Sequence, residues 1–203
     1  MIRIGITGGV GAGKSAVLKH IEENYPVRLL VADEAVHRLE EPGQTCFERL
    51  VEEFGEKILT KDGYLDKKVF AGIIFSDEEA LKKANGILHP AVREYIRKEM
   101  LIEEERNTPC FVLEAALLIE ERYDLLLDEL WYVYASEETR ILRLMENRGY
   151  SREKCLRIMA AQSSEENFRA HCDETIDNDG SVLLMKAQVD ALFENRKISR
   201  KKG

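Results

Sequence analysis

Residues 2–15 decide the fold of this chain, and they read IRIGITGGVGAGKS. The stretch opens as an alternating apolar run, which is typical of a strand, and passes into a glycine-rich turn. From Gly8 onward the turn fits G-x-x-x-x-G-K-[ST], the pattern of a phosphate-binding loop. A helical pattern over residues 15–24 follows, so the motif has the strand–turn–helix context that it needs. The sequence therefore predicts that the chain binds a nucleoside triphosphate, and the alternative is a glycine-rich turn with no ligand.

Each residue type in this loop has a physical role. Glycines let the backbone take positive φ values, so that successive N–H groups can surround an anion. Lys14 can reach the outer phosphates, the Ser15 hydroxyl can ligate Mg²⁺, and the helix directs its positive end at the same phosphates. We expect the whole loop and the next helical residue to contact ATP, namely Gly8, Gly9, Val10, Gly11, Ala12, Gly13, Lys14, Ser15 and Ala16.

The composition limits the class of protein. A chain of 203 residues, 44% of them hydrophobic, suits one α/β domain with a small helical insertion. A net charge of −8 disfavours nucleic-acid binding. No apolar run has the length of a membrane span, and the first strand leads directly into the loop, so we expect no signal peptide, no membrane association and a cytoplasmic location. The four cysteines are scattered, which favours reduced thiols, and His171 with Cys172 favours a structural role over half a metal site.

Two short apolar runs end in a carboxylate. Residues 27–33 end in Asp33 and residues 110–114 in Glu114, and both read as buried parallel strands. Both carboxylates are therefore expected at the C-terminal edge of the sheet, where open α/β sheets bind ligands. Glu114 occupies a place where an acid can order Mg²⁺, directly or through water. Asp33 has the alternative of capping a helix over residues 34–40.

Residues 45–105 show helical patterns and almost no strand signal. A turn at residues 61–63 separates two helices, and Pro90 is placed to begin another that runs to about residue 105. We expect this region to be a helical insertion that holds the acceptor.

The last third returns to strands and ends in a closing helix. Strands are expected at residues 130–134 and 174–177, and the closing helix at 182–193. Between the strands, two helices with a Gly149 tip carry Arg140, Arg143 and Arg148, which suggests a lid that neutralises phosphoryl charge. The alternative is a solvated face of Glu–Arg pairs.

Three classes of nucleotide-binding protein compete for this pattern. A GTPase switch needs N-K-x-D, which is absent from the sequence, and the D-x-x-G at residues 177–180 comes far too late in the chain. A phosphotransferase and a non-catalytic ATP-binding module both remain open, although Asp33, Glu114 and the arginines favour the phosphotransferase.

Several separated motifs together resemble the bacterial dephospho-CoA kinase family, from residue 2 to about residue 193. They agree in order and spacing with that family's pattern. They are the loop at residues 5–15, Ala32-Asp33 before Glu41-Pro42-Gly43, Phe54-Gly55, Gly63-x-Leu65-Asp66, Val69-Phe70, His89-Pro90, Leu117-Leu118-x-Glu120, Arg157-Ile158 before Gln162, and Asp173-x-x-Ile176-x-Asn178-x-Gly180.

The resemblance implies a three-layer α/β P-loop NTPase fold, similar to the nucleoside monophosphate kinases, with a parallel sheet. It implies a core at about residues 1–44, 106–136 and 172–203, a helical CoA-binding domain at about 45–105 and a helical lid at about 137–171. It also implies transfer of the ATP γ-phosphate to the ribose 3′-hydroxyl of dephospho-CoA, the last step of coenzyme A synthesis. The catalytic residues implied are Asp33, Lys14, Arg143 and Arg148, and Asn178 lies where the chain passes the adenine.

The same resemblance implies the acceptor and metal ligands. The acceptor-binding residues are Thr7, Asp33, Lys67, His89 and Glu114. Mg²⁺ is expected at Ser15, with Asp33 or Glu114 reaching it directly or through water. The partners are ATP and dephospho-CoA, with no nucleic acid and no membrane, and the chain is expected as a monomer or a weak homo-oligomer.

The chain departs from the family pattern at a few positions. Val31 and Lys67 stand where the family usually has Asp and Arg, Ala16 replaces Thr, and Glu114 with Ala116 replaces an Asp-x-Pro segment. Lysine keeps the charge of arginine but loses its bidentate fork. Another small acceptor, such as a nucleoside or nucleoside monophosphate, is the alternative substrate.

Overall fold

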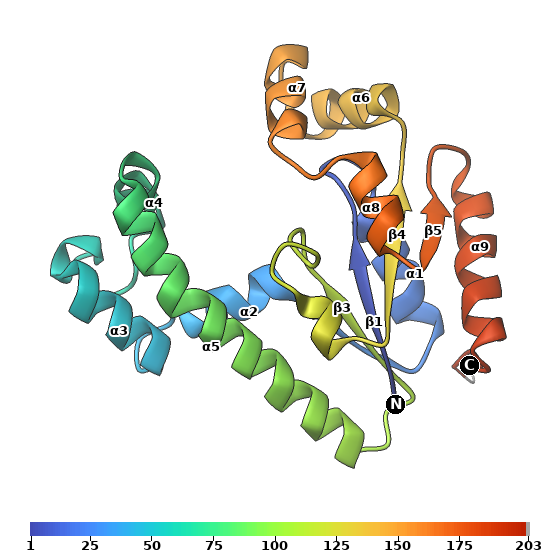
Figure 1. The fold of residues 1–203 in the computed structure, drawn as a ribbon, viewed down its shortest axis with the longest axis horizontal. Helices are drawn as coiled ribbons and strands as arrows, with labels where there is room; N and C mark the ends of the chain where they lie inside the picture. The colour runs from blue at the N-terminus through green and yellow to red at the C-terminus, as the bar shows by residue number, and fades with distance from the viewer. Residues whose placement is uncertain (202–203) are drawn as a thin grey trace. The chain divides into compact units, whose positions relative to one another are not determined.

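Five strands form one sheet in the order β2-β3-β1-β4-β5 (Figure 1). They are β1 (Ile2–Thr7), β2 (Val27–Val31), β3 (Cys110–Glu114), β4 (Glu129–Tyr134) and β5 (Glu174–Asp177). The pairs β1–β3, β1–β4 and β4–β5 are parallel. The structure is a computed structural model that describes residues 1–201, and the chain divides into two units, one of residues 1–29 with the chain from residue 103 onward and one of residues 30–102.

Helices cover both faces of the sheet in the first unit. One face carries Ile4 and Ile6 of β1, which are fully buried against α1 (Lys14–Asn24) and α9 (Val182–Asn195). On the other face, α8 (Glu165–His171) contacts β4 and η2 (Tyr123–Leu126) contacts β1. The Phe168 ring of α8 stacks on Tyr132 of β4 with ring centroids 4.8 Å apart. The prediction of a three-layer α/β fold with a parallel sheet is confirmed.

Serine side chains cap the N-termini of four helices of this unit. In each case the side chain accepts a hydrogen bond from a backbone N–H three residues later, which satisfies one of the donors that a helix leaves free at its start. The serines are Ser136 before α6 (Glu137–Arg148), Ser151 before α7 (Arg152–Ala160), Ser164 before α8 and Ser181 before α9. The pairing of α6 and α7 around Gly149 agrees with the predicted helices, whereas α8 was not predicted.

The second unit is helical, as predicted for an insertion between β2 and β3. It contains α2 (Ala32–Leu39), α3 (Thr45–Phe54), η1 (Glu56–Ile58), α4 (Lys67–Ser76) and most of α5 (Glu78–Glu105). The side chain of Asp66 caps α4 by accepting from the N–H groups of Lys68 and Val69. Leu50, Ile58 and Ala84 are fully buried in a core of this unit's own. Among residues 1–201, no helix combines the length and apolar composition that a membrane span needs.

The prediction that Pro90 begins a helix is wrong, because Pro90 lies inside α5. Proline inside a helix removes one backbone hydrogen bond and its ring crowds the carbonyl group four residues earlier, which together cost about 3 kcal/mol. The apolar face of α5 is buried on both sides of it, through Ala84 and Ile87 before Pro90 and Val92 and Ile96 after it. Burial of this continuous face outweighs this cost.

The predicted strand at residues 27–33 is two residues too long. β2 ends at Val31 and α2 begins at Ala32, so Asp33 lies in the first turn of the helix, where its side chain is exposed. Val31 is the residue before the helix, and no side chain caps it, so the alternative that Asp33 is a capping residue is also wrong. The carboxylate near the helix N-terminus still interacts favourably with the helix dipole.

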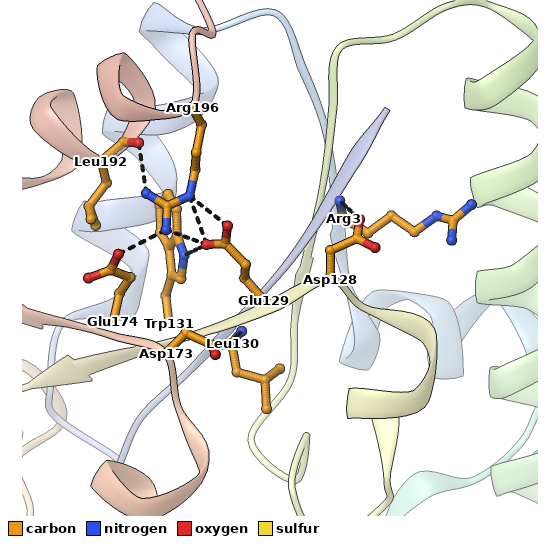
Figure 2. Close-up of polar contacts among 9 residues, drawn as sticks. All are labelled: Arg3, Asp128, Glu129, Leu130, Trp131, Asp173, Glu174, Leu192 and Arg196. Atoms are coloured by element: carbon orange, nitrogen blue, oxygen red, sulfur yellow. Dashed lines mark hydrogen bonds and ion pairs between the residues drawn. The ribbon is translucent and has the colours of Figure 1, made fainter.

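Charged side chains form hydrogen bonds and ion pairs where the strands β4 and β5 begin (Figure 2). This is the opposite end of the sheet from the loop. Arg196, just after α9, donates to both carboxylate oxygens of Glu129 and to Glu174 at 2.9 Å. Its guanidinium carbon lies 4.9 Å from the ring centroid of Trp131. Burial raises the pKa of Glu129, but hydrogen bonds from Arg196 and Trp131 outweigh burial, so the pKa lies below its usual value.

We expect Arg196→Met to lower the free energy of unfolding by about 2 kcal/mol, because the half-buried carboxylates of Glu129 and Glu174 lose their cation. Methionine retains the apolar stem over Trp131. Urea unfolding at pH 7 measures the change. The difference from wild type should shrink as the pH falls through the lowered pKa of Glu129, since a protonated carboxyl group no longer needs the cation.

Arg152→Met is the matched control. Arg152 makes a bidentate pair with Glu138 at 2.8 and 2.7 Å, but both side chains are more than half exposed. Water screens such a pair, so stability should hardly change. Equal losses in the two variants would contradict the role given to burial at Arg196.

Candidate phosphate-binding site

The turn between β1 and α1 has the conformation of a phosphate-binding loop. Gly13, the residue before α1, has a left-handed φ of 89°, and a Cβ added there would lie 2.2 Å from Nδ2 of Asn178. Only glycine therefore fits at this position. Ser15 and Ala16 are exposed in the first turn of α1, where the helix offers its free N–H groups.

Lys14 folds back over the loop. Its Nζ donates to the carbonyl oxygen of Gly8 at 2.8 Å and lies 3.5 Å from Oε1 of Glu114. The β1–β3 register pairs Ile6 with Glu114 and so brings this carboxylate to the strand end that leads into the loop. Both side chains are largely buried, with 17% of Lys14 and 14% of Glu114 exposed. The ammonium group of Lys14 and the carboxylate of Glu114 therefore lie side by side next to the loop.

Asn178 and Arg143 hold the far end of the loop. The buried Asn178 amide donates to the Ala12 carbonyl at 2.8 Å. Arg143 donates to the same carbonyl at 3.2 Å and to the Asn178 carbonyl at 2.8 Å. Arg143 of α6 and Asn178 after β5, both predicted site residues, therefore bind the same carbonyl group, that of Ala12.

Arg140 contacts the loop one helical turn before Arg143. Its Nε donates to the Val10 carbonyl at 2.9 Å, and a Cβ on Gly9 would lie 2.3 Å from its guanidinium. Burial lowers the pKa of Arg140, although nearby Glu137 and Glu165 oppose this. The hydrogen bonds of Arg140 and Arg143 go to neutral oxygens, of backbone carbonyl groups and of the Gln162 amide.

Sequence reasoning placed Arg140 on the predicted lid but gave it no role at the loop. The signal was its spacing, since residues at i and i+3 lie on one face of a helix, and Arg140 and Arg143 both turn to the loop. Arg148, the last residue of α6, is exposed and lies on a different face, so the structure does not bring it to the loop.

Thr7 is fully buried at the end of β1, and its hydroxyl has no hydrogen-bond partner within residues 1–201. Glu114 also belongs to the first unit, whereas Asp33, Lys67 and His89 belong to the second unit. Lys67, the first residue of α4, places its Nζ 3.8 Å from Oε2 of Glu40, whose pKa is raised by burial although Lys67 lowers it. His89 lies half-buried in α5, and Asp33 is exposed in α2. The acceptor roles of these residues stay predictions.

Comparison with known proteins identifies the family. The sequence profile described as dephospho-CoA kinase matches residues 2–183. A dephospho-CoA kinase from Shouchella clausii is 36% identical over 192 residues, which cover 94% of this chain and 97% of the relative. The chain belongs to the dephospho-CoA kinase family. The resemblance derived from the separated motifs is therefore confirmed.

Solved structures agree with this family fold. A protein of Thermus thermophilus is 31% identical, with a TM-score of 0.79 over 96% of this chain and 97% of its own. A dephospho-CoA kinase from Campylobacter jejuni superposes with a TM-score of 0.72, covering 96% of each chain at 23% identity. The P-loop fold that the family resemblance implied is confirmed.

We expect Asn178→Ala to weaken ATP binding by about 10-fold, or about 1.4 kcal/mol, because the Ala12 carbonyl loses a buried donor and the loop loosens. Titration of the protein with ATP, followed by calorimetry, measures the change.

Gln188→Ala serves as the control for this variant. Gln188 also bonds a backbone group beside β5, since it accepts from the Asp177 N–H at 2.9 Å, but it makes no bond to the loop. Its removal should leave ATP affinity unchanged. Equal affinity in Asn178→Ala and wild type would show that this bond does not shape the loop.

Proposed function

We propose that this chain transfers the γ-phosphoryl group of ATP to the ribose 3′-hydroxyl of dephospho-CoA, giving coenzyme A and ADP. The family match over residues 2–183 carries the proposal. The intact loop supports it, because Lys14, Arg140 and Arg143 bring three cations to backbone groups of residues 8–12. A cytoplasmic location and a monomer or weak homo-oligomer complete the proposal.

The donor half of the reaction follows from the contacts of Lys14. A triphosphate seated in the loop offers oxygens that are stronger acceptors than the Gly8 carbonyl, so Lys14 exchanges this carbonyl for the outer phosphates. Phosphoryl transfer passes through a loose transition state, in which positioning and charge neutralisation dominate. Arg143 supplies positive charge at the loop, and Arg148 is proposed to add its charge when the lid meets the nucleotide.

The residues near the loop fit Mg²⁺ rather than a softer metal. The ligands on offer are oxygens, from the exposed Ser15 hydroxyl and the Glu114 carboxylate, and Mg²⁺ prefers oxygen. No cluster of three or more His, Cys, Asp or Glu side chains that could hold a metal occurs within residues 1–201, so phosphate oxygens would complete the shell. Ser15 would hold the ion, with Glu114 or Asp33 reaching it directly or through water. A Mg²⁺ ion held there would supply positive charge next to the phosphate oxygens.

Asp33 is proposed to orient and deprotonate the 3′-hydroxyl. A carboxylate is a sufficient base for a loose transition state, because little proton transfer precedes bond breaking in the donor. Lys67 and His89 would bind the acceptor from the helical unit, and Thr7 and Glu114 from the core. Lys67 offers a single charge where a bidentate arginine would offer a fork.

We expect ADP release with dephospho-CoA and Mg²⁺, and none when EDTA replaces the metal. A coupled ADP assay with dephospho-CoA and a panel of nucleosides and nucleoside monophosphates measures the specificity. Turnover of AMP or CMP without turnover of dephospho-CoA would show that the acceptor is a nucleoside monophosphate instead. ATP binding without turnover on any acceptor would show that the chain is a non-catalytic ATP-binding module.

We expect Lys14→Ala and Asp33→Asn each to lower kcat by at least ~100-fold, the scale of one lost electrostatic or acid–base contribution. Steady-state kinetics with saturating ATP and dephospho-CoA measure the change.

Glu34→Gln is the control for Asp33→Asn. Glu34 is the exposed neighbour of Asp33 in the first turn of α2. Glu34→Gln therefore removes one negative charge from that turn but keeps the proposed base. Its kcat should stay near that of wild type. Near-normal turnover by Asp33→Asn would remove Asp33 from the mechanism.

A further inference from the structure

A single glutamine joins the α7–α8 linker to the phosphate loop. Gln162 lies half-buried in the linker, and its Oε1 accepts from the Val10 N–H at 2.9 Å and from Arg140 Nη2 at 3.2 Å. Arg140 in turn donates from Nε to the Val10 carbonyl at 2.9 Å. Both backbone groups of Val10 and the Arg140 guanidinium are therefore closed into one ring of hydrogen bonds.

The linker that carries Gln162 is itself fixed. The next residue, Ser163, donates its hydroxyl to Glu120, in the segment after β3, and accepts from the Asn167 amide at 3.1 Å. Ser164 caps α8. Gln162 therefore projects from an anchored segment, which lowers the entropy cost of holding its side chain against Val10.

The charge state of residue 162 matters because of what it touches. An amide oxygen is a neutral acceptor, so it holds Arg140 in place and adds no negative charge beside the guanidinium. A carboxylate of the same shape would make the same two hydrogen bonds more strongly, but it would pair with Arg140 and repel a triphosphate at the loop.

We propose that Gln162 is a positioning residue for phosphoryl transfer: it orders Val10 and holds Arg140 against the phosphate loop through a neutral acceptor. The inference rests on the proposed function, because the charge that it preserves is useful only to a reacting phosphoryl group. It also identifies the polar side chain that joins the linker of the predicted lid to the donor site.

Three variants separate positioning from structural support. Gln162→Ala removes both hydrogen bonds, and Gln162→Glu keeps their geometry and adds a negative charge. Ser164→Ala is the matched control, because it removes a helix cap two residues away without touching the loop. Each is measured for thermal unfolding, for ATP affinity without acceptor, and for kcat and KM with ATP and dephospho-CoA.

We expect Gln162→Glu to unfold at or above the wild-type temperature, yet to raise KM for ATP and lower kcat so that kcat/KM falls at least ~10-fold. Gln162→Ala should lose a similar factor in kcat/KM. Ser164→Ala should unfold at a lower temperature with wild-type kinetics.

Wild-type kinetics in Gln162→Glu would overturn the proposal, as would equal kinetic losses in Ser164→Ala and Gln162→Ala, since stability alone would then explain them. The wild-type protein in the same assay separates a failure of the proposed function from a failure of the role proposed for Gln162. If wild type does not phosphorylate dephospho-CoA, the proposed function fails and the transfer role of Gln162 fails with it. If wild type turns over and Gln162→Glu matches it, only the role of Gln162 fails.

Discussion

The conformation of the phosphate loop depends on hydrogen bonds that side chains from distant segments make to its backbone. A loop that directs its N–H groups at an anion turns several carbonyl groups the other way, and buried carbonyls need donors. In this chain the donors are long or charged side chains. They are Lys14 at Gly8, Arg140 at Val10, and Arg143 with Asn178 at Ala12. Closing the loop therefore requires α6 and the turn after β5 to be in place.

This arrangement has an electrostatic consequence. Lys14 has Glu114 as a nearby anion, whereas the two arginines contact only neutral oxygens in the loop. A chain with a net charge of −8 thus concentrates positive charge at one sheet edge. Such local fields, rather than net charge, attract an anionic ligand to its site. The same side chains that shape the loop provide its charge, so loop geometry and triphosphate affinity are coupled.

Much of this could be predicted from the sequence, because local patterns determined it. The loop motif and the apolar strands both depend on residues that lie within a short stretch of the chain. The errors came where tertiary packing outweighs local preference. Pro90 is a local helix signal that the buried face of α5 overrides, and α8 is a short segment defined by the stacking of Phe168 on Tyr132. Gln162 meets Val10 across 152 residues, a contact that spacing alone cannot reveal.

The two ends of the sheet use charged groups in opposite ways. At the strand beginnings, Arg196 is paired with carboxylates, and Asp128 and Asp173 accept the N–H groups of Arg3 and Leu130 (Figure 2). These charged groups have hydrogen-bond partners within the fold, so they contribute to its stability. At the strand ends, Arg140 and Arg143 form hydrogen bonds to neutral oxygens, and bringing their charges together there costs stability until an anion binds. A protein can carry that cost only if other regions supply the difference, which is why the paired charges at the strand beginnings matter to an enzyme whose chemistry lies at the opposite edge.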